Sequence, residues 1–249
     1  MIGLETDLLV NQGLVVSSNH GDIIVMDSPD RRDFWYGHGF VLLSEPNVIE
    51  LTELIADGRR RFGSLGVTRF VIQWEHLYPD APRITVPEGA VIDRTMALVF
   101  KGEPPPDDTR AVDLTGEMWI EAGRLVRDEY AQSADFMSRR LDDLRGLVDR
   151  GCARVVGVIE DGCLRSIAGI VRDSRNARFM MPVTQPAARR RGYFSACART
   201  LINWALQDAK RQAVIVVDPI EGPLSLYRNL GFVPTSYVES ILVPASEHQ

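Results

Sequence analysis

Three consecutive arginines and a glycine, Arg189–Gly192, stand immediately before a segment with the apolar spacing of a helix. The apolar positions on one face of this helix are Phe194, Cys197, Ala198, Leu201, Ile202 and Ala205. A helix N-terminus presents backbone N–H groups that lack helical partners, and the helix dipole is positive there. Gly192 leaves the backbone open to close approach, and guanidinium groups donate paired hydrogen bonds. The pattern predicts a site for a phosphate-like anion; the alternative is a solvated basic turn.

The elements around this loop favour the anion site. The segment Ala177–Val183 before the loop and the all-apolar run Ala213–Val217 after the helix are both typical of strands. A strand–loop–helix–strand unit places the loop at the carboxyl end of a strand, where ligands bind in open α/β sheets. The loop carries neither a GxxxxGK[ST] nor a GxGxxG pattern, which argues against the common nucleotide-binding domains.

The rest of the second half supplies helices and strands to flank this unit. The expected elements are a short strand at Val112–Leu114, helices at Glu117–Glu129 and Ala134–Val148, hairpin strands at Val155–Ile159 and Leu164–Val171, a short helix from Leu224 that ends at Gly231, and a last strand at Tyr237–Val243.

Two motifs in this order resemble those of the GNAT superfamily of acyl-CoA N-acyltransferases. The segment that begins at Thr184 and contains Arg189-Arg-Arg-Gly-Tyr-x-Ser-Ala is similar to the family's pyrophosphate-binding loop. The segment Leu-Tyr227-x-x-x-Gly231-Phe, which places Tyr227 35 residues after Gly192, is similar to the family's C-terminal signature. The resemblance covers about residues 109–243.

The resemblance implies an α/β (α+β) fold with a mixed, mostly antiparallel, splayed sheet flanked by helices, and acetyl-CoA (coenzyme A) as the cofactor. The pantetheine arm would lie in the opening between the strands Ala177–Val183 and Ala213–Val217, like an added strand. The residues that the resemblance assigns to the cofactor are Val183, Thr184, Arg189, Arg190, Arg191, Gly192, Tyr193, Phe194 and Ser195.

The implied activity is transfer of the acetyl group to a primary amine of a small molecule or peptide, directly and in a ternary complex. Tyr227 stands where the family's general acid protonates the departing thiolate, and the alternative for this residue is a packing role. A rival function is a non-catalytic acyl-CoA-binding regulatory module.

The sequence departs from the family pattern in three places. Phe194 replaces the usual Gly or Ala, so its ring either narrows the approach to the phosphates or turns into the core. The strand Ala177–Val183 contains no Asp or Glu to act as a base, and Ile220 replaces a frequent Asn. We therefore expect a water chain, Asp218, Glu221 or a residue of the first half to accept the amine proton.

The first half, residues 1–105, is predicted to be a smaller mixed α/β domain that binds no cofactor, followed by a domain over residues 106–249. The proline-rich segment Lys101–Thr109 is the most linker-like part of the chain. Expected elements are strands at Asp22–Met26, Phe40–Leu43, Thr68–Gln73 and Thr95–Phe100 and a helix after Pro46 with Leu51, Leu54, Ile55 and Phe62 on one face.

Aromatic residues in the segment Phe34–Phe40 resemble a stretch in tandem GNAT proteins whose first half is degenerate. His38 lies in this segment, and a structural role is favoured over a role as a base. The basic cluster Arg59–Arg61 falls toward the end of its helix, where the dipole repels anions. One acetyl-CoA is therefore expected per chain.

Composition narrows the remaining possibilities. The 249 residues are 45% hydrophobic and 25% charged, as in a globular protein, and residues 1–108 carry 9 Lys and Arg against 17 Asp and Glu. This balance argues against nucleic acid as a partner and mildly favours a cationic amine. No segment predicts a membrane span or signal peptide, so a cytoplasmic monomer or homodimer is expected. The three cysteines are expected to be buried thiols, and their spacing and that of the histidines predict no metal site.

Overall fold

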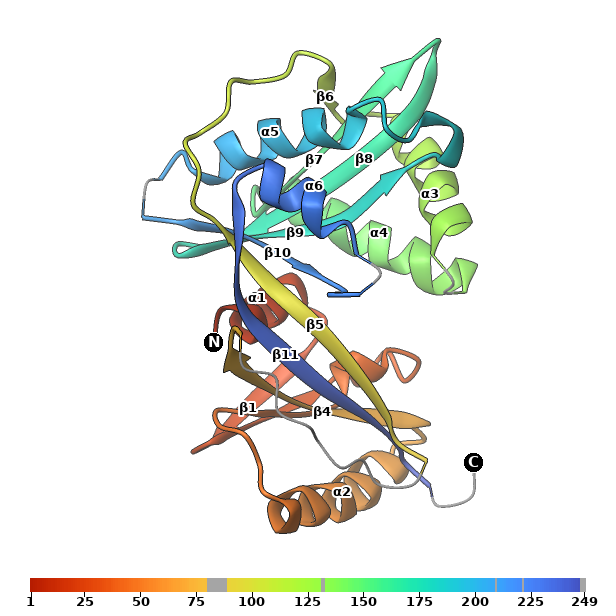
Figure 1. Cartoon of the computed structure of the whole chain (residues 1–249). Coiled ribbons are helices and arrows are strands. Elements are labelled where there is room, and N and C mark those ends of the chain that lie inside the picture. Colours follow the sequence, from red (N-terminus) through yellow and green to blue (C-terminus); the bar gives the residue numbers. More distant parts are fainter. Residues whose placement is uncertain (80–88, 131–132, 209, 221, 247–249) are drawn as a thin grey trace. The chain divides into compact units, whose positions relative to one another are not determined.

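A computed structural model of the chain describes residues 1–79, 89–130, 133–208, 210–220 and 222–246 (Figure 1). The chain forms two compact units. Unit 1 comprises Met1–Leu98, Val216–Leu224 and Pro234–Gln249, and unit 2 comprises Val99–Ile215 and Ser225–Val233. The C-terminal segment therefore belongs to the unit that the N-terminal residues build.

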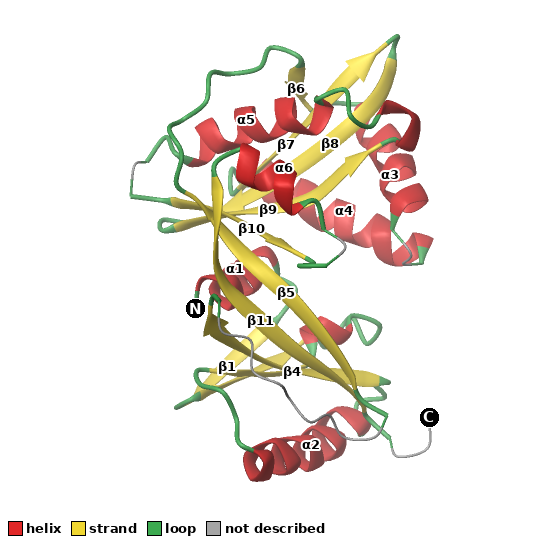
Figure 2. Cartoon of the chain, viewed as in Figure 1, coloured by secondary structure: helices red, strands yellow, loops and turns green. Residues whose placement is uncertain are grey.

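Unit 1 is a sheet with a helix on each face (Figure 2). Its elements are α1 (Ile2–Val10), β1 (Val16–His20), β2 (Ile23–Asp27), β3 (Gly39–Leu42), α2 (Val48–Gly63), β4 (Arg69–Leu77) and most of β5 (Val91–Phe100) and of β11 (Phe232–Pro244). The strand order is β1-β2-β3-β4-β11-β5. Strands β3 and β4 pair in parallel, whereas β11 pairs with β4 in an antiparallel ladder.

Helix α2 is fixed at its start by its own side chains. Asn47 accepts hydrogen bonds from the N–H groups of Ile49 and Glu50 at 2.9 and 3.0 Å, and the Glu50 carboxylate accepts one from the Asn47 N–H at 2.9 Å. This capping box stabilises the first turn, and the helix buries Leu51, Ile55 and Phe62 against the sheet.

Unit 2 is also built of strands and helices (Figure 2). Its elements are β6 (Ala111–Asp113), α3 (Met118–Glu129), α4 (Ala134–Asp149), β7 (Ala153–Glu160), β8 (Cys163–Arg172), β9 (Asn176–Thr184), the short helix η2 (Pro186–Ala188), α5 (Tyr193–Ala205), most of β10 (Gln212–Val217) and most of α6 (Leu224–Asn229). The strand order is β10-β9-β8-β7-β6. Helix α5 packs on β7 and β8, while α3 and α4 lie against each other, with α4 also on β7.

The expected elements of the second half are all present, with shifted ends. Helix α4 buries Leu147 where the sequence predicts Val148, and β11 begins at Phe232, five residues before the predicted start of the last strand. In unit 1, α1 and β1 were not predicted. The expectation of three buried thiols is wrong for Cys163, which is exposed at the start of β8, and Cys152 is only half-buried.

The proline-rich segment Lys101–Thr109 is fastened along α5. The Asn203 side-chain N–H groups donate to the Pro105 carbonyl at 2.6 Å and to the Asp107 carboxylate at 2.8 Å. The segment therefore forms part of unit 2, and the boundary predicted near residue 106 falls inside it. None of the described helices is both long enough and apolar enough to cross a membrane.

Replacing Gly39 should destabilise unit 1 strongly. Its φ is +152°, and a Cβ there would lie 1.8 Å from the Val71 carbonyl oxygen of the neighbouring strand β4. Gly39→Ala is expected to lower the free energy of unfolding by about 3 kcal/mol, because strand backbone would have to move. Urea denaturation measures this loss. The matched control is Gly13→Ala, where φ is +81° and the space is open, with a loss of about 1 kcal/mol. Equal losses in both variants would contradict the steric argument.

Candidate functional site

The loop before α5 forms an open helix N-terminus. Gly192 is the N-cap residue, in the left-handed conformation (φ 78°, ψ 13°), and no side chain among the described residues caps the helix. The first helical hydrogen bond runs from the Ala196 N–H to the Gly192 carbonyl at 3.0 Å. The N–H groups of Tyr193, Phe194 and Ser195 therefore have no partner within the helix, and the positive end of the dipole adds to them.

The three arginines of the loop differ in their partners. Arg189 forms an ion pair with Glu129 at the end of α3, and its Nε donates to the Thr184 carbonyl at 3.3 Å. Arg191 donates two hydrogen bonds to Glu160, at 2.5 and 2.7 Å. Arg190 is exposed, has a φ of 64° and makes no ion pair within the described part of the chain. The side chains of Arg189 and Arg191 thus hold the loop to its neighbours, while Arg190 is left for solvent or a ligand.

Strands β9 and β10 separate toward this loop. Their parallel ladder joins Gln212–Val214 to Asn176–Arg178, and in the described residues no pair follows although β9 continues to Thr184. Farther along β9, Met181 has a φ of 47° and the register with β8 shifts, which is a β-bulge. The edge of β9 beyond Arg178 therefore has no strand paired with it on the β10 side. An extended ligand can form backbone hydrogen bonds with such an edge.

The last residues of β9 are held by side chains of unit 2. The Val183 carbonyl accepts a hydrogen bond from the Ser166 hydroxyl at 2.9 Å, and that hydroxyl lies 2.8 Å from the Thr184 hydroxyl. Val183 and Thr184 thus lie at the end of β9, next to the start of the loop, and their contact with a cofactor stays a prediction.

Tyr227 is buried among aromatic rings at the end of α6. Its residue exposure is 4%, and its ring meets Phe194 edge-on at 5.8 Å between centroids and Phe232 at 6.5 Å. The Phe194 ring, which is half-buried, thus packs against the Tyr227 ring, and its effect on the approach to the phosphates stays a prediction. The Tyr227 hydroxyl makes no hydrogen bond with any described residue.

Burial, and to a smaller degree the neighbouring Tyr130, raises the pKa of Tyr227 from 10.0 to about 12. The phenol is therefore protonated at neutral pH and can donate a hydrogen bond. Complete transfer of its proton to a thiolate, whose conjugate acid has a pKa of about 8.5, would run uphill. The raised pKa favours hydrogen-bond donation to a departing sulfur over outright proton transfer.

Asp218 and His38, two of the residues considered as bases, contact groups within unit 1. The Asp218 carboxylate accepts a hydrogen bond from the Ile220 N–H at 2.6 Å within its own turn, and Glu221 lies outside the described residues. His38 is 1% exposed, with Nδ1 2.9 Å from the Asp27 carboxylate and Nε2 3.1 Å from the Arg31 carbonyl. Both ring nitrogens of His38 are therefore engaged, as expected of a structural histidine.

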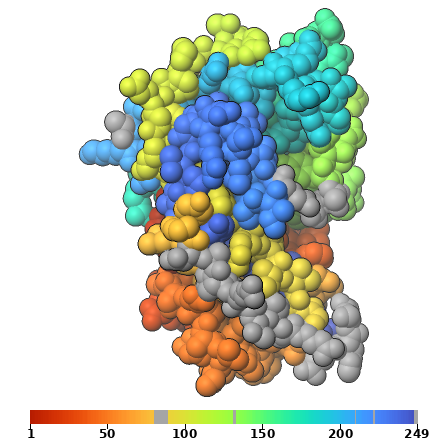
Figure 3. Space-filling model, in the orientation of Figure 1, coloured from red at the N-terminus to blue at the C-terminus, as the bar shows by residue number. Residues whose placement is uncertain are grey.

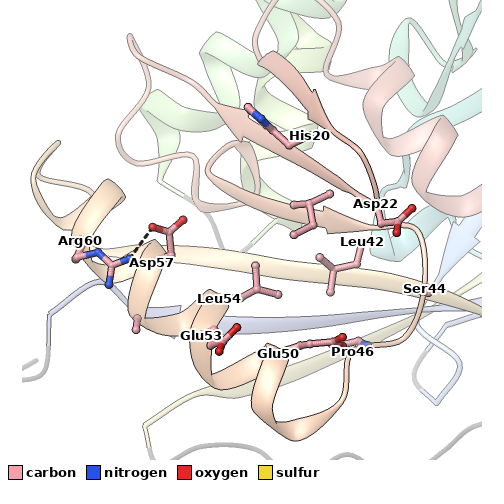
Figure 4. Close-up of a pocket in the computed structure, with 12 residues that line it drawn as sticks. His20, Asp22, Leu42, Ser44, Pro46, Glu50, Glu53, Leu54, Asp57 and Arg60 are labelled. Atoms are coloured by element: carbon pink, nitrogen blue, oxygen red, sulfur yellow. Dashed lines mark hydrogen bonds and ion pairs between the residues drawn. The ribbon is translucent and has the colours of Figure 1, made fainter.

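Helix α2 of unit 1 also follows a strand, but the start of this helix is capped by side chains. The capping box of Asn47 and Glu50 uses the first N–H groups of α2 that an anion would need. A pocket of about 750 Å³ beside α2 is lined by acidic groups, Asp22, Glu53 and Asp57 among them, and Arg60 pairs with Asp57 (Figure 4). Its charge disfavours a polyanionic ligand.

One residue near the loop was missed by the sequence reasoning. The Arg110 guanidinium Nη2 lies 3.9 Å from the position a Cβ on Gly192 would take. Arg110 follows the proline-rich segment, 82 residues before Gly192, and no local pattern connects the two.

Comparison with known proteins supports the fold assignment. No family model and no curated protein matches this sequence. Among solved structures, a conserved protein of unknown function from Staphylococcus epidermidis is similar with a TM-score of 0.74 at 8% identity, each chain being 96% covered. A GCN5-related N-acetyltransferase from Kribbella flavida has a TM-score of 0.63 at 18% identity, covering 99% of this chain and 97% of its own. A tandem GNAT protein from the clavulanic acid biosynthesis pathway has a TM-score of 0.60 at 13% identity, covering 100% and 93%. The chain has the GNAT fold, as its two motifs predict.

Removing the Phe194 ring should lower the pKa of Tyr227. Phe194→Ala admits water to the Tyr227 ring, so the pKa is expected to fall from about 12 toward the ordinary 10.0. In NMR of ¹³C-labelled tyrosine between about pH 9 and 11, the Tyr227 signal should titrate in Phe194→Ala and hardly move in the unmodified protein, with Tyr227→Phe to assign the signal. Phe194→Leu keeps an apolar side chain against Tyr227, so the pKa of Tyr227 in this variant should stay close to that of the unmodified protein. An unchanged pKa in Phe194→Ala would show that the ring does not shield the phenol.

Proposed function

We propose that this protein is an acyl-CoA-dependent N-acetyltransferase that moves an acetyl group from acetyl-CoA to a primary amine of a small molecule or peptide. The observation that carries the proposal is the uncapped N-terminus of α5, reached through Gly192 from a strand that has separated from its neighbour. In a GNAT fold this combination suits a pyrophosphate on the N–H groups and an extended arm along β9.

The chain's own residues would divide the work of binding. The N–H groups of Tyr193, Phe194 and Ser195 would donate to the pyrophosphate, with Arg190 adding charge. Arg189 and Arg191, tied to Glu129 and Glu160, would hold the loop in its binding conformation. Val183 and Thr184 would pair with the pantetheine arm through backbone groups.

The thioester of acetyl-CoA supplies the activated acetyl group. In direct transfer a C–N bond forms to the acceptor amine, the C–S bond breaks, the amine loses a proton and the departing sulfur gains one. Tyr227 would donate its hydroxyl hydrogen bond to that sulfur as negative charge develops. Since β9 carries no Asp or Glu, the amine proton would leave through water or a residue outside this strand.

The two halves of the chain, residues 1–105 and 106–249, would share one arrangement of strands and a connecting helix. In unit 1 the antiparallel pair β2–β3 leads through α2 to the parallel strand β4. In unit 2 the antiparallel pair β8–β9 leads through α5 to the parallel strand β10. Of the two connecting helices, α2 has a side-chain cap and α5 has none among the described residues, which supports one acetyl-CoA per chain.

Gly192→Val should weaken acetyl-CoA binding by on the order of 1–3 kcal/mol, because a side chain at φ 78° strains the loop and covers the N–H groups. Isothermal titration calorimetry measures the affinity and is expected to give one site per unmodified chain. Gly151→Val, at φ 73° in open space after α4, is the matched control and should bind normally. Unchanged affinity in a folded Gly192→Val variant, or two sites per chain, would contradict the proposal.

Tyr227→Phe should lower kcat by roughly 10²-fold with little change in acetyl-CoA affinity, because the hydrogen bond to sulfur forms as the thiolate develops. A thiol-release assay over a panel of primary amines, under conditions where chemistry limits turnover, measures kcat. Wild-type turnover in this variant would leave Tyr227 with a packing role. Tight acetyl-CoA binding by the unmodified protein, with no amine-dependent thiol release, would instead favour a non-catalytic acyl-CoA-binding module.

A further inference from the structure

The proline-rich segment Lys101–Thr109 positions the next residue, Arg110, beside the open N-terminus of α5. Its carbonyl and carboxylate groups at Pro105 and Asp107 accept hydrogen bonds from Asn203, and the Thr200 hydroxyl lies 3.5 Å from the Asp108 carbonyl. These contacts fix the segment along the outside of α5, where its yellow-green atoms lie at the surface (Figure 3). The next residue, Arg110, is thereby brought to the first turn of the helix.

Asp108 holds the Arg110 guanidinium in one orientation. Arg110 Nε and Nη2 donate to the two carboxylate oxygens at 2.9 and 2.8 Å, and the Arg110 backbone N–H donates to the same group at 3.2 Å. A bidentate pair of this kind fixes the plane of the guanidinium. Within the described residues, Nη1 donates no hydrogen bond, so the group retains donors for a ligand.

The Asp108 carboxylate is shared by two arginines. Arg199, one turn further along α5, lies 3.8 Å from the same carboxylate, so two guanidinium groups share one negative charge. Hydrogen bonding to Arg110 lowers the pKa of Asp108 to about 2, so the carboxylate stays ionised and paired with Arg110 at neutral pH. With its side chain about half exposed, Arg110 faces solvent beside Gly192.

We propose that Arg110, oriented by Asp108, is a phosphate-binding residue of the acyl-CoA site. The inference rests on the proposed function and extends it to a segment outside both GNAT-like motifs. The N–H groups of α5 and the Arg110 guanidinium, 3.9 Å from a Cβ position on Gly192, would then meet the phosphates from two sides. The pyrophosphate and the 3′-phosphate of the cofactor are both anionic phosphate groups that Arg110 could bind. Binding measurements distinguish which of the two it contacts.

The test is calorimetry on the intact chain with acetyl-CoA and with its 3′-dephospho analogue. Arg110→Gln is expected to weaken acetyl-CoA binding by about tenfold or more. Arg110→Lys, which keeps the positive charge but loses the paired N–H donors of the guanidinium group, should weaken it by less. If Arg110 contacts the 3′-phosphate, Arg110→Gln should bind both compounds with similar affinity. If it contacts the pyrophosphate, both should weaken by the same factor.

The matched control is Arg154→Gln on β7, which breaks a comparable pair with Asp113 of β6, where Arg154 Nε lies 2.7 Å from the carboxylate. This variant should bind acetyl-CoA as the unmodified protein does. Unchanged binding of both compounds by a folded Arg110→Gln variant would overturn the assignment of Arg110 and leave the proposed function standing. Failure of the unmodified protein to bind acetyl-CoA would overturn the proposed function itself.

Discussion

The open N-terminus of α5 is the feature around which unit 2 is organised. Helix ends normally find side-chain or solvent partners for their first N–H groups, and Gly192 has no side chain to offer. The helix is secured by burial instead: eight of its thirteen residues are buried, including Cys197, Leu201 and Ile202. Because packing holds α5 in place, its first turn can remain available to an anion.

Helices α2 and α5 follow similar strand arrangements but begin differently. Both helices connect parallel neighbouring strands, and both follow the second strand of an antiparallel pair. In α2 the amide oxygen of Asn47 accepts hydrogen bonds from the first N–H groups, while in α5 Gly192 has no side chain that could do so. The two cap residues also differ in backbone conformation, since Asn47 is extended and Gly192 is left-handed.

The loop, α5 and the strands on each side of it could be predicted from the sequence because each has a clear period and the glycine stands at the junction. Helix α1 and strand β1 could not. All five residues of β1 are exposed and most are polar, so they show no alternation, and α1 has little amphipathic character. Partners distant in sequence were also beyond reach, since nothing local links Glu129 to Arg189 or Arg110 to Gly192. The orientation of the Phe194 ring likewise depends on α6, 30 residues later.

The pairing of β11 with β4 sets the order in which unit 1 can mature. The Gln73 side chain donates to the Ser240 hydroxyl at 2.9 Å, across 167 positions of sequence, at the centre of the ladder. Such distant contacts close a large loop and form late. During synthesis, one edge of β4 stays unpaired until the residues of β11 have left the ribosome. The N-terminal half is translated first, but its sheet is completed last, which makes β4 the edge most in need of protection while the chain is being made.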